Sequence, residues 1–175
     1  MKLSELFSQS KPTLSFEVFP PKAQDLFEKV SDAVSEIASL KPDYMSVTYG
    51  AGGGISDFTV KIAQDIEKHH KVPALAHLTC VSSSKEQIES QLAQLKQAGI
   101  KNILALRGDI PKEGLSKTGA FKYASELIEE IKKHGDFSIG GACYPEGHIE
   151  CESLDEDIKN IAKNRISIIH VGILI

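Results

Sequence analysis

Three features that would assign a chain to a class at once are missing from this sequence. No apolar run approaches the roughly 20 residues that a membrane-spanning helix needs, and residues 1–7 are too few and too charged for a signal peptide. Lys and Arg form no block and the formal net charge is −4, which argues against nucleic acid or an anionic membrane as a partner. We expect a soluble, cytoplasmic protein.

Cysteine is also scarce, and its placement excludes two kinds of site. Cys80, Cys143 and Cys151 are an odd number and lack the spacing of metal ligands. They indicate reduced thiols and no disulfide framework, and the sequence predicts no metal site. Hydrophobic residues make up 41% and charged residues 25% of the 175, with no internal break in composition. These values are typical of one globular domain, 1–175.

The chain does contain a regular alternation of two local patterns. Short runs with β-propensity recur about every 30 residues, the size of a βαβ unit. Six strands are predicted, at Thr13–Phe19, Tyr44–Thr48, Ala74–Cys80, Asn102–Leu106, Ser138–Ala142 and Ile166–Ile175. Apolar residues with a 3.6-residue period predict five helices, within Leu26–Leu40, Phe58–Ile66, Ile88–Ala98, Tyr123–Ile131 and Leu154–Ile161.

Residues that begin and end helices support these boundaries. A serine among Ser82–Ser84 is a predicted N-cap for the third helix, with Glu86 or Gln87 near its third position. Gly99 is a C-cap for that helix, and Ser153 is an N-cap for the fifth.

Strict alternation of strands and helices predicts an α/β fold with a parallel sheet and helices outside it. The residues leave two architectures open. One is a doubly wound open sheet, and the other is an eight-fold (β/α) barrel, which typically needs about 250 residues.

The first predicted strand contains a carboxylate. In SFEVFPPK, residues 15–22, Glu17 lies in an apolar run that two prolines end. A buried glutamate is costly unless it is paired or used, and parallel α/β folds hold their chemistry at the C-terminal ends of strands. The residues alone leave two interpretations, a functional carboxylate or a surface glutamate on an edge strand.

Later strands also end in polar residues. The glycines of Gly50–Gly54 form either a phosphate-binding loop or a flexible βα connection. His77 is either functional or a core histidine, and Arg107–Asp109 is either a ligand clamp or an ion pair. Tyr144–His148 is either a ligand contact or an aromatic packing lid with a polar turn. Parallel strands end at one edge of the sheet, here called the rim, so we expect one site there.

These segments together resemble the methylenetetrahydrofolate reductase family, over roughly the first 160 residues. The matching segments, in family order, are FEVFPPK at 16–22, SVTYGAGG at 46–53, HLTC at 77–80, LALRGD at 104–109, YASEL at 123–127 and YPEGH at 144–148. The resemblance implies a flavoprotein (β/α)8 barrel of the TIM type. It also implies an oxidoreductase of one-carbon metabolism and methionine biosynthesis, which reduces 5,10-methylenetetrahydrofolate to 5-methyltetrahydrofolate.

The resemblance implies roles for two carboxylates. Glu17 matches the family's general acid, which protonates the folate as its methylene bridge opens to an iminium ion. Burial beside apolar residues favours the protonated form of such an acid. Asp109 matches an aspartate near the flavin and the pterin, where a carboxylate favours the cation and opposes more negative charge on the reduced flavin.

By the same matching, FAD is the cofactor, NAD(P)H is the electron donor and a folate is the substrate. The implied FAD-binding residues are Thr48, Tyr49, Ala51, His77, Arg107, Gly108, Asp109, Tyr123, Ala124, Ala142, Tyr144, His148, Asp157, Asn160 and Lys163.

After about residue 163 the sequence departs from the family. The glutamine that binds the pterin in the family is missing, and the tail 164–175 is divergent and apolar. We therefore expect a single incomplete barrel, truncated to about five βα units plus a sixth strand. Open strand edges favour pairing with another chain, which predicts a homo-oligomer.

Two functions other than the reductase remain open. The missing glutamine favours a catalytically inactive truncated barrel that could still bind flavin. A generic phosphate-binding α/β protein would rest on the Gly50–Gly54 loop alone.

Overall fold

A computed structural model describes residues 1–9, 11–21, 23–49, 56–109, 119–143, 153–163 and 168–171. Six parallel strands form one sheet in chain order, namely β1 (Ser15–Val18), β2 (Tyr44–Val47), β3 (Ala74–Thr79), β4 (Asn102–Leu106), β5 (Ser138–Cys143) and β6 (Ile168–Val171). A doubly wound sheet reverses its strand order at a switch point, whereas a (β/α) barrel does not. The observed order therefore supports the barrel type.

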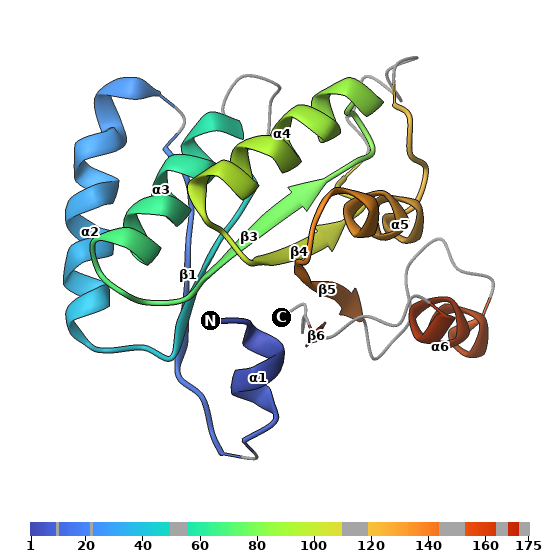
Figure 1. Ribbon diagram of the computed structural model, residues 1–175, viewed down its shortest axis with the longest axis horizontal. Coiled ribbons are helices and arrows are strands. Elements are labelled where there is room, and N and C mark those ends of the chain that lie inside the picture. The colour runs from blue at the N-terminus through green and yellow to red at the C-terminus, as the bar shows by residue number, and fades with distance from the viewer. Residues whose placement is uncertain are drawn as a thin grey trace.

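A helix connects each pair of consecutive strands. These helices are α2 (Phe27–Ser39), α3 (Ser56–Lys68), α4 (Lys85–Ala98), α5 (Ala124–His134) and α6 (Leu154–Lys163), and a 3₁₀ turn, η1 (Gln24–Leu26), precedes α2. A short helix, α1 (Leu3–Phe7), precedes β1. Figure 1 shows α2 to α5 following one another around one side of the sheet, while α1 lies apart from them.

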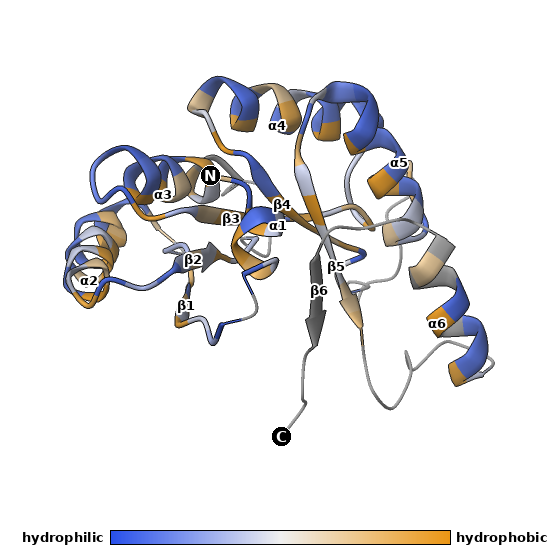
Figure 2. Ribbon diagram, turned by 60° about the horizontal axis from the view of Figure 1, so that its bottom comes forward, coloured by the Kyte–Doolittle hydropathy of each residue, from blue (hydrophilic) through white to orange (hydrophobic). Residues whose placement is uncertain are grey.

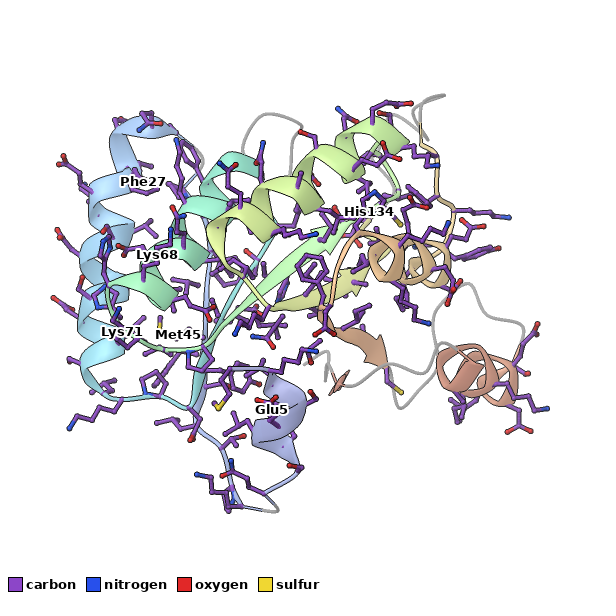
Figure 3. All side chains as sticks on the ribbon, viewed as in Figure 1. Glu5, Phe27, Met45, Lys68, Lys71 and His134 are labelled. Atoms are coloured by element: carbon purple, nitrogen blue, oxygen red, sulfur yellow. The ribbon has the colours of Figure 1, made fainter. Side chains whose placement is uncertain are left out.

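The face of the sheet toward α2–α5, here called the outer face, carries the main core. Met45 and Val47 of β2 are fully buried there with Val34 of α2. Phe27 of α2, labelled in Figure 3, contacts Phe58 of α3. Their ring centroids are 5.6 Å apart. Figure 2 shows that these helices turn apolar residues to the sheet and polar residues to solvent. The amphipathic pattern read from the sequence thus builds this layer.

The opposite, inner face carries a second, smaller apolar cluster. Leu75 of β3 and Leu104 of β4 are buried there against Leu3 and Leu6 of α1. Strand residues alternate between the two faces, so the neighbours of Leu75 and Leu104 along the chain belong to the outer core. Helix α1 covers this cluster, and toward the rim the same face carries Leu106 of β4 and the polar residues Glu17, Ser46 and His77.

A buried asparagine attaches α1 to the sheet. Asn102, at the start of β4, is fully buried. Its Oδ1 accepts the backbone N–H of Leu3 at 2.8 Å, and its Nδ2 donates to the carbonyl oxygens of Met1 at 3.2 Å and Ala74 at 3.0 Å. One side chain therefore satisfies polar groups of α1 and β3 that the apolar packing would otherwise leave unpaired.

The predicted helix caps are confirmed. Ser84 caps α4: its Oγ accepts the N–H of Gln87 at 3.3 Å, and the Gln87 Oε1 accepts the N–H of Ser84 at 2.7 Å. Gly99 ends α4 with φ of +84°, a left-handed conformation that favours glycine. Ser153 caps α6, since its Oγ accepts the N–H of Glu156 at 3.2 Å.

Helix α1 and the extent of β1 differ from the sequence prediction, and residues 166–167 and 172–175 of the predicted last strand lie outside the described residues. Helix α1 was not predicted, because five residues are too few to show a helical period, and packing against the sheet stabilises it. Strand β1 is shorter than Thr13–Phe19, because the Leu14 N–H donates to the Asp43 carboxylate at 2.8 Å and not to a neighbouring strand. In the described parts of the chain, no helix is long and apolar enough to cross a membrane.

Replacing Asn102 tests how α1 is held. Asn102→Ala is expected to lower the free energy of unfolding by about 2–4 kcal/mol in urea titrations, because it leaves one N–H and two carbonyl groups without their partner. Gln97→Ala, at an exposed position of α4, is the control and should change it by less than about 0.5 kcal/mol. Equal effects of the two substitutions would show that Asn102 does not anchor α1.

Candidate functional site

Three polar side chains meet on the inner face toward the rim. Glu17 of β1 pairs in register with Ser46 of β2, and Ser46 pairs with Leu75 of β3, two residues before His77. The Ser46 hydroxyl donates to Oε2 of Glu17 at 3.3 Å, and Nε2 of His77 lies 3.5 Å from the same oxygen. The register of three parallel strands therefore brings a carboxylate, a hydroxyl and an imidazole together.

Exposure differs sharply within this group. Ser46 and His77 are each 7% exposed, whereas the side chain of Glu17 is 38% exposed. Of the two interpretations of Glu17 left open by the sequence, its position is the exposed one on an edge strand. Strand β1 is an edge of the described sheet, so only one neighbouring strand covers the carboxylate. Glu17 is both paired and open to a ligand, with its contacts to Ser46 and His77 made through Oε2.

The end of β2 is held from two sides. The N–H of Thr48 donates to the carbonyl oxygen of Val18 at 3.0 Å, and the Thr59 hydroxyl donates to the carbonyl oxygen of Thr48, also at 3.0 Å. The Tyr49 hydroxyl accepts a hydrogen bond from Nε2 of Gln91 at 2.6 Å. The side chain of Tyr49 thus packs against the outer core, and the backbone at Thr48 and Tyr49 is fixed at the rim.

The connection after β4 is fastened to the connection after β3. The carbonyl oxygen of Arg107 accepts the backbone N–H groups of Cys80 and Val81, at 3.2 and 2.8 Å. The Cys80 thiol is buried, with Sγ 3.8 Å from that carbonyl oxygen and 3.7 Å from the carbonyl oxygen of Tyr123. Burial raises the pKa of Cys80 to about 12. Cys80 is therefore a packing residue and not a nucleophile.

A glycine then turns the chain toward the rim. Gly108 has φ of +81°, and a Cβ built on it would lie 3.0 Å from Cβ of Thr79. Both the left-handed backbone and this close approach favour glycine. Nε of Arg107 donates to the carbonyl oxygen of Gly108 at 3.3 Å, and Asp109 follows as an exposed residue. The turn thus places a carboxylate in solvent just beyond the strand end.

The start of α5 brings Tyr123 to the same rim. Tyr123 is 48% exposed, and a carboxylate oxygen of Glu126 accepts its backbone N–H at 3.3 Å and that of Lys122 at 2.6 Å. Ala124 is the first residue of α5, and Ala142 lies near the end of β5, both half-buried.

Six of the expected FAD-binding residues are beyond what the structure describes. Ala51, Tyr144 and His148, with the Gly50–Gly54 loop, lie outside the described residues. Asp157, Asn160 and Lys163 lie on α6, of which only the backbone is described at these positions.

One group of side chains with metal-ligating atoms lies away from the strand ends, between α4 and α5. Glu89, Glu130 and His134 have such atoms within 4.8 Å of one another. His134 is labelled in Figure 3. Lys133 donates to the Glu130 carboxylate at 2.9 Å, and this hydrogen bond lowers the pKa of Glu130. Ion pairs within each helix account for the carboxylates of this group, with Lys85 3.7 Å from Glu89 in α4 and Lys133 paired with Glu130 in α5.

The sequence reasoning missed two residues that the geometry brings to the site. Ser46 is buried within an apolar strand, where its pairing with Glu17 depends on strand register. Gln91 interrupts the apolar stripe of α4, between Ile88 and Leu95, and this interruption is the signal that could have revealed it.

The fold has a solved counterpart. The chain superposes with a TM-score of 0.61 on the crystal structure of a proposed phosphonomutase from Burkholderia cenocepacia J2315, over 96% of this chain and 73% of that one. The two sequences are 11% identical, so the likeness concerns the fold alone.

Proteins similar in sequence are more informative about the family than this similarity of fold. The chain is 40% identical over 159 residues to 5,10-methylenetetrahydrofolate reductase of Pectobacterium carotovorum subsp. carotovorum, covering 91% of this chain and 52% of that protein. It is 36% identical over 155 residues to the Escherichia coli K12 enzyme of that name, covering 89% of this chain and 51% of that enzyme. It is 41% identical over 142 residues to methylenetetrahydrofolate reductase 2 of Schizosaccharomyces pombe, covering 78% of this chain and 22% of that protein.

The chain spans about half the length of the two bacterial relatives. The family model for methylenetetrahydrofolate reductase matches residues 2–167. This match covers most of the chain, including every described residue from β1 to the end of α6. The chain belongs to the methylenetetrahydrofolate reductase family.

Proposed function

We propose that this protein is a FAD-dependent reductase that converts 5,10-methylenetetrahydrofolate to 5-methyltetrahydrofolate with NAD(P)H as the electron donor. The proposal rests on family membership and on one observation, the contact of Ser46 and His77 with a single carboxylate oxygen of Glu17. A carboxyl with one oxygen held and a partly exposed side chain suits a general acid, because it is positioned and can still be reached by a substrate.

The described residues at the rim fit a flavin. A flavin presents carbonyl acceptors, an N–H donor and anionic phosphates. The rim presents a guanidinium at Arg107 and a carboxylate at Asp109, and the imidazole of His77 lies buried beside Glu17. We infer that these residues, with the backbone at Thr48 and Gly108, hold the flavin. Once bound, the flavin would carry hydride from NAD(P)H to the folate. The other FAD contacts expected from the resemblance stay predictions.

Glu17 has the proposed task of delivering a proton. Its Oε2 accepts the Ser46 hydroxyl, so the proton to be transferred belongs on Oε1. Protonating a folate nitrogen converts it into a better leaving group as the methylene bridge opens, and a positioned acid assists such a step. Ser46 and His77 keep the carboxyl oriented toward the rim while this happens.

Asp109 has the proposed task of electrostatic stabilisation. It lies beyond the end of β4 on a turn that Arg107 and Gly108 fasten to β3. A fixed carboxylate there would stabilise a cation on the substrate and oppose negative charge on a neighbouring group. Self-association and a cytoplasmic location, also expected from the sequence, stay predictions.

Replacing the proposed acid separates the two half-reactions. Glu17→Gln keeps the side-chain shape and an acceptor for Ser46 but removes the acidic proton. We expect folate reduction to fall by about 10²–10⁴-fold in stopped-flow assays, whereas NAD(P)H oxidation by the bound flavin should be unchanged. Glu28→Gln, the same substitution at an exposed position of α2, is the control and should leave both rates unchanged. Equal folate-reduction rates in wild type and Glu17→Gln would remove Glu17 from the mechanism.

Replacing Asp109 tests the electrostatic role. Asp109→Asn is expected to raise the midpoint potential of the bound flavin by about 30 mV, which is about 1.4 kcal/mol for a two-electron couple, because a negative charge no longer opposes reduction. The potential is measured by equilibrium titration against a reference dye. An unaltered potential together with unaltered folate kinetics would show that Asp109 lies away from the reacting groups.

A further inference from the structure

A buried amide lies behind the end of β2 and takes no part in the proposed chemistry. Gln91 of α4 is 9% exposed and occupies the apolar stripe of that helix with Ile88, Leu92 and Leu95. An amide removed from water costs free energy unless its donors and acceptor are paired. A glutamine in this stripe therefore calls for a physical reason.

The side chain of Gln91 makes one hydrogen bond among the described residues. Its Nε2 donates to the Tyr49 hydroxyl at 2.6 Å, and its Oε1 is buried without a hydrogen-bond partner there. For stability alone, an apolar residue of similar shape would serve better, because it would remove the unpaired carbonyl oxygen. The contribution of Gln91 is thus its hold on Tyr49.

The space beside this pair is too small to be a ligand site. A cavity of about 10 Å³ lies between β2, β3, α3 and α4, and Tyr49, His77 and Gln91 are among the residues that line it. Such a volume is about that of one water molecule. Gln91 therefore lies behind two residues of the proposed flavin site, Tyr49 and His77, without facing a ligand itself.

Tyr49 stands where the sheet no longer fixes the chain. The register of β2 ends at Val47, and the last backbone bond to β1 is from the Thr48 N–H to Val18 at 3.0 Å. Beyond that bond, two hydrogen bonds hold the strand end to the helices. The Thr59 hydroxyl of α3 donates to the carbonyl oxygen of Thr48 at 3.0 Å, and Gln91 of α4 donates to the Tyr49 hydroxyl. Only the bond from Gln91 acts through the side chain of Tyr49.

We propose that Gln91 is a positioning residue of the flavin site. By holding the Tyr49 hydroxyl, it fixes the Tyr49 ring against α4 and, together with the Thr59 bond to Thr48, fixes the rim backbone at the end of β2. This inference rests on the proposed function, which places that backbone against the flavin. Gln91 contributes to flavin affinity through Tyr49 and not by contact.

A double-mutant cycle with FAD tests the proposal. Tyr49→Phe and Gln91→Met each remove the hydrogen bond and keep most of the side-chain volume, and each should weaken FAD binding by about fivefold in fluorescence titrations. The double variant should bind FAD no more weakly than either single variant, because both substitutions remove the same bond. Gln91→Glu keeps a group that can hydrogen-bond the Tyr49 hydroxyl. This variant should bind FAD with an affinity close to that of the wild type. Gln94→Met, elsewhere on α4, is the control and should bind FAD like the wild type.

Hydrogen exchange in the protein without flavin gives an independent readout. In Gln91→Met and Tyr49→Phe, amides of Tyr44–Tyr49 should exchange faster, while those of Asn102–Leu106 should not change. Unchanged FAD affinity in both single variants, or losses that add in the double variant, would overturn the proposal. If the wild type binds no FAD, the proposed function fails. In that case hydrogen exchange still tests whether Gln91 fixes the end of β2. Unchanged exchange of the Tyr44–Tyr49 amides in both variants would overturn this part of the proposal as well.

Discussion

The register of the first three strands is the constraint on which the candidate site depends. Glu17, Ser46 and His77 are separated by about 30 residues each, and only parallel pairing in this register brings them to one face. A slip of one residue would turn Glu17 to the helix-covered side, because strand residues alternate between faces. The outer core holds the register, since Met45 and Val47 can be buried under α2 and α3 in only one alignment.

The two ends of the inner face have different roles. Near the N-terminal ends of the strands, α1 packs on Leu75 and Leu104, and Asn102 satisfies the polar groups that this contact buries. At the rim, the same face presents Glu17 and His77. The apolar end gives stability, and the polar end is free to carry chemistry, as parallel barrels generally divide these tasks.

Much of this arrangement could be predicted from the sequence, because it follows from local patterns. Periodicity gives the strands and helices, and Ser84 and Gly99 mark the ends of α4. Long-range pairing could not be predicted. The bond from Ser46 to Glu17 depends on register, and the exposure of Glu17 depends on β1 being an edge of the described sheet. Helix α1 was missed because tertiary packing, and not a repeating pattern, stabilises it.

The most direct test of the central claim is the visible absorption spectrum of the purified protein after incubation with FAD and exhaustive desalting. We expect a flavin spectrum to be retained, because hydrogen bonds hold Thr48 and Arg107 at the ends of β2 and β4, at the rim to which His77 also belongs. Circular dichroism of the same sample establishes that the chain is folded. A folded protein that retains no flavin would contradict the account.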